Sequence, residues 1–236
     1  MTQLNKKGFT IVELMLAMGI VSALMIGIAV MVMQMSAIMT RGNTLKELNV
    51  AARTINSDFT ERFNSVQTVY GWNGESVPSA TSGASYIKNA NGGAFCTGNF
   101  TYLWNSASNL NSNDPNPVRY DGDDNNSDAI RLIRIKDTSK KYCNTSNEWT
   151  KIPKGTSEVT EVLSTGETGL MIYDISFTLA NANTVSGQSL INIQYTLGTR
   201  SDNGQVSNSQ CNPGNSYQDY CAINKFNLTV RTIGRG

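Results

Sequence analysis

The stretch KKGFTIVELMLAMGIVSALMIGIAVMVM, from Lys6 to Met33, decides how the chain is organised. Its last twenty residues, from Leu14 onward, contain Ser22 as the only polar side chain. As a helix these residues would span about 30 Å, which is the thickness of the hydrocarbon core of a bilayer. Lys6 and Lys7 precede the run, as is usual at the cytoplasmic end of a membrane helix. The stretch therefore predicts a helix that crosses a membrane once.

A single carboxylate, Glu13, lies near the start of this apolar run. A lone carboxylate in hydrocarbon costs several kcal/mol unless it is neutralised or paired, so Glu13 is a candidate functional residue. Cutting the chain between Gly8 and Phe9 would create an ammonium group on Phe9, about one helical turn from Glu13. Cleavage at this bond would supply the counter-charge that a plain membrane anchor lacks.

The segment KKGFTIVELMLAMGIV resembles the class III signal of type IV pilins and of type II secretion pseudopilins. The shared features are a short basic leader, glycine before the cut, phenylalanine after it, and glutamate four residues further on. The resemblance implies that prepilin peptidase cleaves between Gly8 and Phe9 and that Phe9 is then N-methylated. It also implies that Glu13 pairs with the terminal amine of a neighbouring subunit and serves assembly, not catalysis.

An amphipathic segment follows the apolar run. Apolar residues recur in it at spacings of three or four, as on one face of a helix: Leu45, Leu48, Ala52, Ile55, Phe59, Phe63, Val66 and Tyr70. We expect one helix from Phe9 to about Val69, with Gly42 as a place for a bend, because glycine weakens a helix by about 1 kcal/mol relative to alanine. The predicted organisation is a leader at 1–8, a transmembrane or fibre-core helix at 9–39, an amphipathic helix at 40–70 and a β-rich head at 71–236.

Strand patterns are strongest in the second half of the head. Residues 71–128 are rich in Gly, Ser and Asn, so we expect long loops there with one or two short strands, such as 100–104. Residues 129–136 predict a central strand, and 190–198 and 226–230 alternate between apolar and polar residues.

The segment LMIYDISFTLA has the same alternation, and it places five apolar side chains on one face: Met171, Tyr173, Ile175, Phe177 and Leu179. Alternation with one polar face is typical of an antiparallel sheet. The predicted fold class is α+β, pilin-like, with one long N-terminal helix packed against an antiparallel sheet of about four to seven strands.

All four cysteines, Cys96, Cys143, Cys211 and Cys221, lie in the head. None forms a C-x-x-C pair, and the chain has no histidine, so the spacing does not resemble a zinc site. Two disulfides in an oxidising compartment are favoured over free buried thiols. Three pairings are open; a short loop favours Cys211 with Cys221, which leaves Cys96 with Cys143.

A weak calcium-site pattern occurs in DGDDNNSD. Asp121, Asp123 and Asn125 stand at alternate positions, like the first half of a calcium-binding loop. Asn126 and Leu132 stand where an EF-hand needs glycine and glutamate, so a solvated acidic loop is the preferred interpretation. We expect no cofactor and no other metal site.

The segment KKYCNTSNEWTKIPK is the one candidate for DNA binding. It combines Lys140, Lys141, Lys151 and Lys154 with two aromatic residues, Tyr142 and Trp149, and it includes Glu148. Since the formal net charge of the chain is only +1, direct nucleic-acid binding is not expected. An enzyme is not expected either, because the chain lacks histidine, a nucleotide-binding loop and a G-x-S-x-G motif.

The order of features over the whole chain resembles PilW-type minor pilins and the related J-type pseudopilins. The segments that carry this likeness are AARTINSDFTERF, SDAIRLIRI and the C-terminal FNLTVRTIGRG. Many major pilins have a proline in the apolar half of the helix, whereas the first proline here is Pro78. The resemblance implies a structural minor pilin near the pilus tip that primes assembly and supports adhesion, twitching motility or DNA uptake. The alternative is a J-type pseudopilin of type II secretion, and a third reading is an adhesive head that binds a ligand through the loops of 71–128.

The same resemblance implies partners and a location. The partners are other minor and major pilins, prepilin peptidase, the inner-membrane assembly platform and a tip adhesin. The chain would cross the bacterial inner membrane once, with its head in the periplasm, before it enters a pilus at the cell surface.

Overall fold

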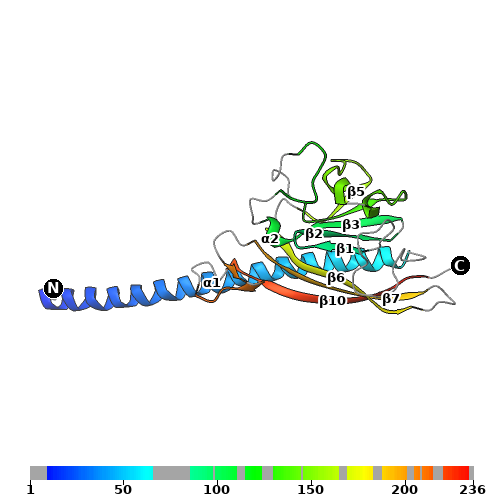
Figure 1. The fold of residues 1–236 in the computed structure, drawn as a ribbon. Coiled ribbons are helices and arrows are strands. Elements are labelled where there is room, and N and C mark those ends of the chain that lie inside the picture. The colour runs from blue at the N-terminus through cyan, green and yellow to red at the C-terminus, as the bar shows by residue number, and fades with distance from the viewer. Residues whose placement is uncertain are drawn as a thin grey trace, which may run out of the picture.

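The computed structural model describes residues 10–65, 86–97, 99–110, 115–123, 130–144, 146–164, 169–182, 188–200, 205–207, 209–214 and 220–233. One long N-terminal helix carries a β-rich head with antiparallel sheets (Figure 1). The α+β, pilin-like class predicted from the sequence is thereby confirmed.

The helical elements are α1 (Ile11–Phe63), α2 (Ala107–Leu110), α3 (Lys141–Asn144) and the 3₁₀ turn η1 (Ser146–Thr150). The strands are β1 (Tyr86–Asn89), β2 (Gly92–Cys96), β3 (Phe100–Asn105), β4 (Leu132–Lys136), β5 (Val159–Leu163), β6 (Leu170–Ala182), β7 (Ser189–Thr199), β8 (Val206–Ser207), β9 (Gln210–Cys211) and β10 (Ile223–Arg231).

Helix α1 is continuous over 53 residues, which corresponds to about 80 Å. It begins after the N-cap Thr10, passes through Gly42 without a break and ends before the C-cap Asn64. Its end at Phe63 is earlier than the end near Val69 that the periodicity predicted. Residues 66–70 lie outside the described part of the chain.

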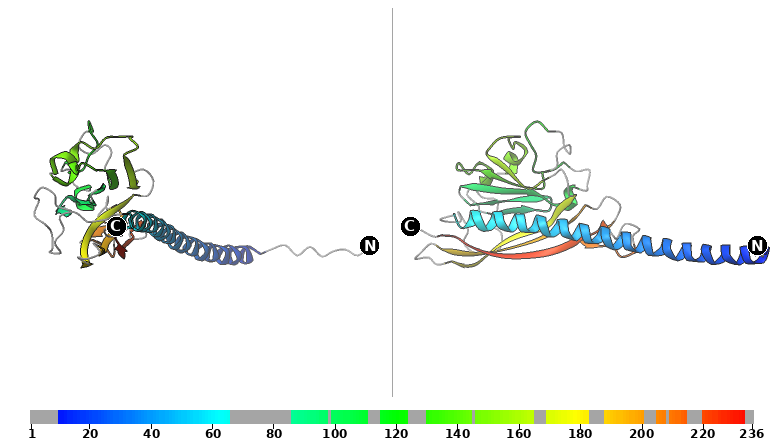
Figure 2. Two further views of the ribbon diagram at one scale, coloured as in Figure 1. Left: turned by 90° about the vertical axis from the view of Figure 1, so that its right-hand side faces the viewer. Right: turned by 180° about the vertical axis from the view of Figure 1, so that it is seen from behind.

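The first half of α1 projects away from the head (Figures 1 and 2). Its large apolar side chains, from Ile11 to Met39, are between 43 % and 79 % exposed. By length and composition this helix can cross a membrane. The exposure follows from the sequence, because this half is apolar on every face and the head covers none of its apolar window.

The second half of α1 is buried along one face. Five residues of the predicted stripe are buried in the head: Leu48, Ala52, Ile55, Phe59 and Phe63. Leu45 is 41 % exposed, so the buried stripe starts one turn later than predicted. Val66 and Tyr70 lie outside the described residues.

The head contains two main sheets where the sequence predicted one. The first has the order β1-β2-β3-β4-β5 and the second the order β10-β7-β6, while β8 and β9 form a separate ribbon. All the paired strands within these sheets are antiparallel. Helix α1 lies between the two main sheets (Figure 1), and a single apolar core joins side chains of the helix to both.

Side chains connect the two sheets where β1 meets β6. The hydroxyl of Tyr86 donates a hydrogen bond of 3.1 Å to the carbonyl oxygen of Ile175. Lys88 forms an ion pair with Asp174. The two sheets therefore cover α1 from two sides and meet along β1 and β6. Strands β5 and β10 are the edge strands farthest from this contact.

The predicted inward face of β6 is wrong in the first half of the strand. Leu170 and Ile172 lie in the core with Ile175, whereas the alternation had placed Met171 and Tyr173 there. The cause is a β-bulge, because Tyr173 is an extra residue relative to β7. One extra residue reverses the alternation of side chains on either side of it. In β7 and β10 the predicted apolar residues do face the core.

The other face of the five-stranded sheet carries a second apolar cluster, which includes Leu103, Ile133, Ile135, Trp149 and Ile152. One disulfide joins β2 to α3 beside it, between Cys96 and Cys143. The other joins Cys211 to Cys221. These are the two pairings that the sequence favoured.

Candidate functional site

The first turn of α1 holds Glu13 in a capping box. The backbone N–H and the hydroxyl of Thr10 each donate to Glu13 Oε2 at 3.0 Å. In return the backbone N–H of Glu13 donates to Thr10 Oγ1 at 3.3 Å. Gly8 and Phe9, the predicted cleavage and methylation residues, lie outside the described part of the chain.

The position of Glu13 suits an electrostatic role. A carboxylate in the first turn lies at the positive end of the helix dipole and satisfies backbone N–H groups that have no partner within the helix. Glu13 is also the only ionisable side chain between Ile11 and Thr40. Within the apolar half of α1, Glu13 is therefore the one side chain whose charge could pair with a cation.

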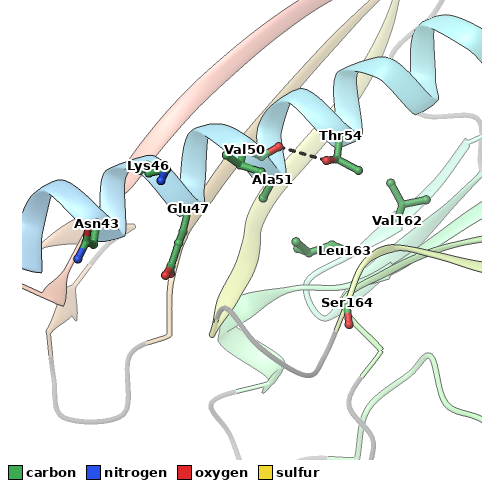
Figure 3. A pocket seen from close by; sticks show the side chains of 9 residues that line it. All are labelled: Asn43, Lys46, Glu47, Val50, Ala51, Thr54, Val162, Leu163 and Ser164. Carbon is green, nitrogen blue, oxygen red and sulfur yellow. Dashed lines mark hydrogen bonds between the residues drawn. The ribbon is translucent and has the colours of Figure 1, made fainter.

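A second feature is an apolar cleft between α1 and the end of β5, with a volume of about 410 Å³ (Figure 3). Val50 and Ala51 of α1 line one side, and Val162 and Leu163 line the other. Polar and charged side chains complete the lining: Asn43, Lys46, Glu47, Thr54 and Ser164. Val50 is 54 % exposed within it. No sequence pattern predicts this cleft, because it depends on where β5 lies against the helix.

Polar contacts inside the head fix how α1 sits between the sheets. Asp58 forms an ion pair with Arg134 of β4 and accepts a hydrogen bond of 2.7 Å from the hydroxyl of Tyr102. The hydroxyl of Tyr195 lies 2.9 Å from Asn56 Oδ1 and 3.1 Å from the carbonyl oxygen of Ala52. Burial raises the pKa of Tyr102, and the nearby Asp58 carboxylate raises it further. These contacts set both the depth and the rotation of the helix within the head.

The calcium candidate does not form a ligand cluster in the part of it that is described. Asp123 Oδ1 lies 3.5 Å from Lys154 Nζ, so a lysine is its cationic neighbour. Asn125, the third proposed ligand, lies outside the described residues. Among the residues that the structure describes, no group of three or more His, Cys, Asp or Glu side chains could hold a metal ion.

The candidate DNA-binding segment has its aromatic rings turned inward. Trp149 is fully buried and donates from Nε1 to the carbonyl oxygen of Tyr142 at 2.9 Å, and Tyr142 is also buried. Lys141 and Lys151 both form ion pairs with Glu148, at 3.0 Å and 3.3 Å. The hydrogen bond from Lys141 holds the pKa of Glu148 below its usual value. The segment therefore offers neither open rings for base stacking nor unpaired charge at these two lysines.

Residues 3–29 match the family model described as the prokaryotic N-terminal methylation motif. The match spans Gly8, Phe9 and Glu13 and extends into the apolar half of α1. It supports a type IV pilin or pseudopilin signal, which implies processing by prepilin peptidase and an assembly pathway that starts from the inner membrane. No curated protein and no solved structure matches the chain.

Proposed function

We propose, from the premise of a methylation motif at residues 3–29, that the chain is a structural minor pilin that is cleaved after Gly8 and built into a type IV pilus. The observation that carries this proposal is the exposed apolar half of α1 (Figure 2). Such a surface is stable only in contact with lipid or with other apolar surfaces. Lipid would surround this surface in the membrane before assembly. Neighbouring pilin helices would cover it in the fibre afterwards.

A PilW-like subunit is the more specific form of the proposal. Its support is the layout of the chain, with a long helix, an irregular stretch and late strands, and the absence of proline from the apolar half of α1. Two disulfides suit a head that folds in the oxidising periplasm. The subunit would join other pilins near the pilus tip, prime assembly and so support adhesion, twitching motility or DNA uptake.

The proposed role is structural, without catalysis. Charged side chains of the head form ion pairs with one another or with α1: Arg134 with Asp58, Lys88 with Asp174, and Lys141 with Glu148. The two tyrosines that contact α1 through their hydroxyls, Tyr102 and Tyr195, hold the helix in place. These contacts support a head built to carry and orient α1.

Mass spectrometry of the mature N-terminus tests the proposal directly. The protein is isolated from its own membranes, from cells with and without prepilin peptidase, and its intact mass and N-terminal peptide are measured. We expect a chain that begins with methylated Phe9 only where the peptidase is present. A chain that begins with Met1 in both cells would show that the stretch is a permanent anchor.

A second measurement distinguishes a subunit of a type IV pilus from a subunit of a type II secretion fibre. Deleting the gene should reduce the number of surface pili and twitching motility, while export of folded proteins by type II secretion continues. The opposite result, normal pili with lost secretion, would identify a J-type pseudopilin.

A further inference from the structure

We propose that Arg131 and Arg200, two arginines of the head beside the cleft between α1 and β5, form a binding site for a phosphate group. The inference goes beyond the proposed function, because it adds a ligand to a head whose other polar contacts are structural. It applies equally to a subunit of a pilus and to a subunit of a secretion fibre.

Arg131 is a buried cation without a carboxylate partner. It directly precedes β4, and only 6 % of it is exposed. Its Nη1 donates a hydrogen bond of 3.0 Å to the carbonyl oxygen of Ser164, whereas its Nε is buried and has no hydrogen-bond acceptor. Within the described part of the chain, Arg131 forms no ion pair. A buried charge and a buried donor are both costly when they have no partner, so an anion would complete this arrangement.

Arg200 provides a second guanidinium near Arg131. It directly follows β7, and its backbone N–H donates a hydrogen bond of 2.8 Å to the carbonyl oxygen of Gly169. Burial lowers the pKa of Arg131, and the positive charge of Arg200 lowers this pKa further. Glu161 acts in the opposite direction, but its Oε1 accepts a hydrogen bond of 2.7 Å from the hydroxyl of Tyr120. Two guanidinium groups that repel each other suit an oxyanion, because their planar sets of N–H donors match the oxygens of phosphate.

The site lies close to the surface. Ser164, whose carbonyl oxygen binds Arg131, is exposed and lines the cleft between α1 and β5 (Figure 3). Lys46 lines the same cleft and forms no ion pair with any residue in the described ranges. Glu47 lines it as well, so the arginines, not the border of the cleft, give the site its positive charge. Rotation about the side-chain bonds of Arg131 would present Nε to a phosphate group beside Ser164.

Two sources could supply the phosphate group. One is free phosphate in the solution around the head. The other is the headgroup of a membrane lipid, since Asn43 at one end of the cleft lies only four residues beyond Met39 in the exposed apolar half of α1. Both sources present the same tetrahedral oxyanion to Arg131, so the experiment has to distinguish them.

Thermal unfolding of the full chain in a neutral detergent tests the site. The fluorescence of the buried Trp104 and Trp149 reports unfolding of the head. Inorganic phosphate is titrated at neutral pH, with sodium chloride keeping the ionic strength constant. We expect the unfolding midpoint to rise by about 5 °C when phosphate reaches about 100 times its dissociation constant. No rise, or an equal rise with acetate, would overturn the phosphate site.

Matched arginine variants separate binding from the general stabilisation that phosphate gives by its exclusion from protein surfaces. Arg131→Met should abolish the specific rise. Arg231→Met removes an exposed arginine at the end of β10 that lies away from Arg200, and it should leave the rise unchanged. A response to phosphate that is the same in Arg131→Met and Arg231→Met would overturn the inference.

The stability of Arg131→Met without phosphate is a second test. Since this variant removes a buried charge that lacks a counter-ion, its midpoint should equal or exceed that of the unaltered chain. A lower midpoint would show that Arg131 is held by a structural partner and would overturn the inference.

Two bilayers distinguish the sources of phosphate. The full chain is reconstituted without free phosphate in nanodiscs of phosphatidylglycerol or of digalactosyldiacylglycerol, a lipid that has no phosphate. A higher midpoint in phosphatidylglycerol that Arg131→Met abolishes would assign the site to a lipid headgroup. Equal midpoints in the two bilayers, with an Arg131-dependent rise when inorganic phosphate is added, would assign it to free phosphate. No Arg131-dependent difference under any of these conditions would overturn the inference.

One carboxylate of the chain needs its own control. Glu167 stands between Ser164 and Gly169 in the sequence and lies outside the described residues. Glu167→Gln should respond to phosphate as the unaltered chain does. A response that appears only in Glu167→Gln would show that the chain supplies the anion itself, and this result would overturn the inference.

Discussion

Arg134 of β4 forms an ion pair with Asp58 of α1, and this pair ties the helix to the five-stranded sheet. The two side chains are only 14 % and 16 % exposed. Tyr102 donates to the other carboxylate oxygen of Asp58, so the carboxylate is satisfied from two neighbouring strands. The contact is the main polar link across an otherwise apolar interface, and its loss should be costly.

Replacing Arg134 by methionine should therefore destabilise the head. Arg134→Met leaves the largely buried Asp58 carboxylate without its cation, and we expect the free energy of unfolding to fall by about 3 kcal/mol. Urea unfolding of the full chain in detergent, followed by the fluorescence of the buried Trp104 and Trp149, measures the change. The double variant Asp58→Leu with Arg134→Met should recover part of the loss, because it removes the stranded charge. A single variant as stable as the unaltered chain would contradict this account.

The long helix and its two halves could be predicted from the sequence because each half has one dominant pattern. Twenty nearly uniform apolar residues admit few structures besides a membrane helix, and the stripe from Leu48 to Phe63 admits few besides a helix with one buried face. The paired alternation within β7 and β10 was as clear, since the apolar residues that alternate over 191–197 and 226–230 face the same core.

Other parts of the fold depend on contacts that no local pattern reveals. Residues 86–105 form three strands, whereas the richness in glycine predicted loops with one or two short strands. The glycines are needed within β2, since a Cβ on Gly93 would lie 2.3 Å from Trp104 Cζ2. In the same way the bulge at Tyr173 and the cleft between α1 and β5 arise from the fit between elements, not from the elements alone.

The two disulfides should differ in their contribution to stability. Cys96 and Cys143 are 47 residues apart, and Cys211 and Cys221 are 10 residues apart. From the entropy of loop closure we expect losses of about 4 and about 3 kcal/mol when each pair is replaced by alanine. Urea unfolding of the two double variants under identical conditions gives the comparison. A larger loss for the short loop would show that packing around Cys211 outweighs chain entropy.

The same disulfides should also differ in their rate of reduction. Cys96 and Cys143 are both 2 % exposed, and the buried Asp137 carboxylate lies 3.6 Å from Cys143 Sγ. An attacking thiolate must enter the core and approach this negative charge, whereas Cys211 is only half-buried. Dithiothreitol at neutral pH should therefore open Cys211–Cys221 first, by at least about tenfold in rate. Timed alkylation with peptide mass spectrometry measures both rates. Equal rates would show that burial and the Asp137 carboxylate do not protect the Cys96–Cys143 disulfide.

Alkaline pH should weaken the head through its buried tyrosines. Burial raises the pKa of Tyr86, Tyr102 and Tyr195 above their ordinary value, with added contributions from Asp174 at Tyr86 and Asp58 at Tyr102. Above pH of about 10 the unfolded chain loses these protons while the folded chain keeps them, so the free energy of unfolding falls as pH rises. The stabilisation is complete below that pH. Each tyrosine adds a slope of up to about 1.4 kcal/mol per pH unit.

Tyrosine-to-phenylalanine variants test the assignment of this slope. Tyr195→Phe should lower the slope between about pH 10 and 11 by up to about 1.4 kcal/mol per pH unit, because it removes one of the buried tyrosines that contribute to it. Tyr220, which is 55 % exposed, is the matched control, and Tyr220→Phe should leave the slope unchanged. Urea midpoints at several pH values provide the measurement. Identical slopes for Tyr195→Phe and the unaltered chain would show that Tyr195 does not contribute to the loss of stability at alkaline pH.

The capping box at the start of α1 predicts an order in which substitutions reduce the incorporation of the chain into fibres. Glu13→Gln removes the only charge of the apolar half and should reduce the processed chain in sheared fibres about tenfold relative to the membrane, because a charge-assisted pair is lost. Thr10→Val keeps the charge but removes the hydroxyl that holds Glu13, so its effect should be smaller, about threefold.

Ser22→Ala is the control for this series, since the Ser22 hydroxyl donates only to the carbonyl oxygen of Met18 within the same helix and should not matter. Cleavage after Gly8 should continue in all three variants, and quantitative mass spectrometry of fibre and membrane fractions gives the ratios. Because the three changes lie on one exposed helix, a general loss of helix stability would affect them alike. Only a specific role of the Glu13 charge gives the order Glu13→Gln, Thr10→Val, Ser22→Ala, and a Glu13→Gln chain that enters fibres normally would exclude that role.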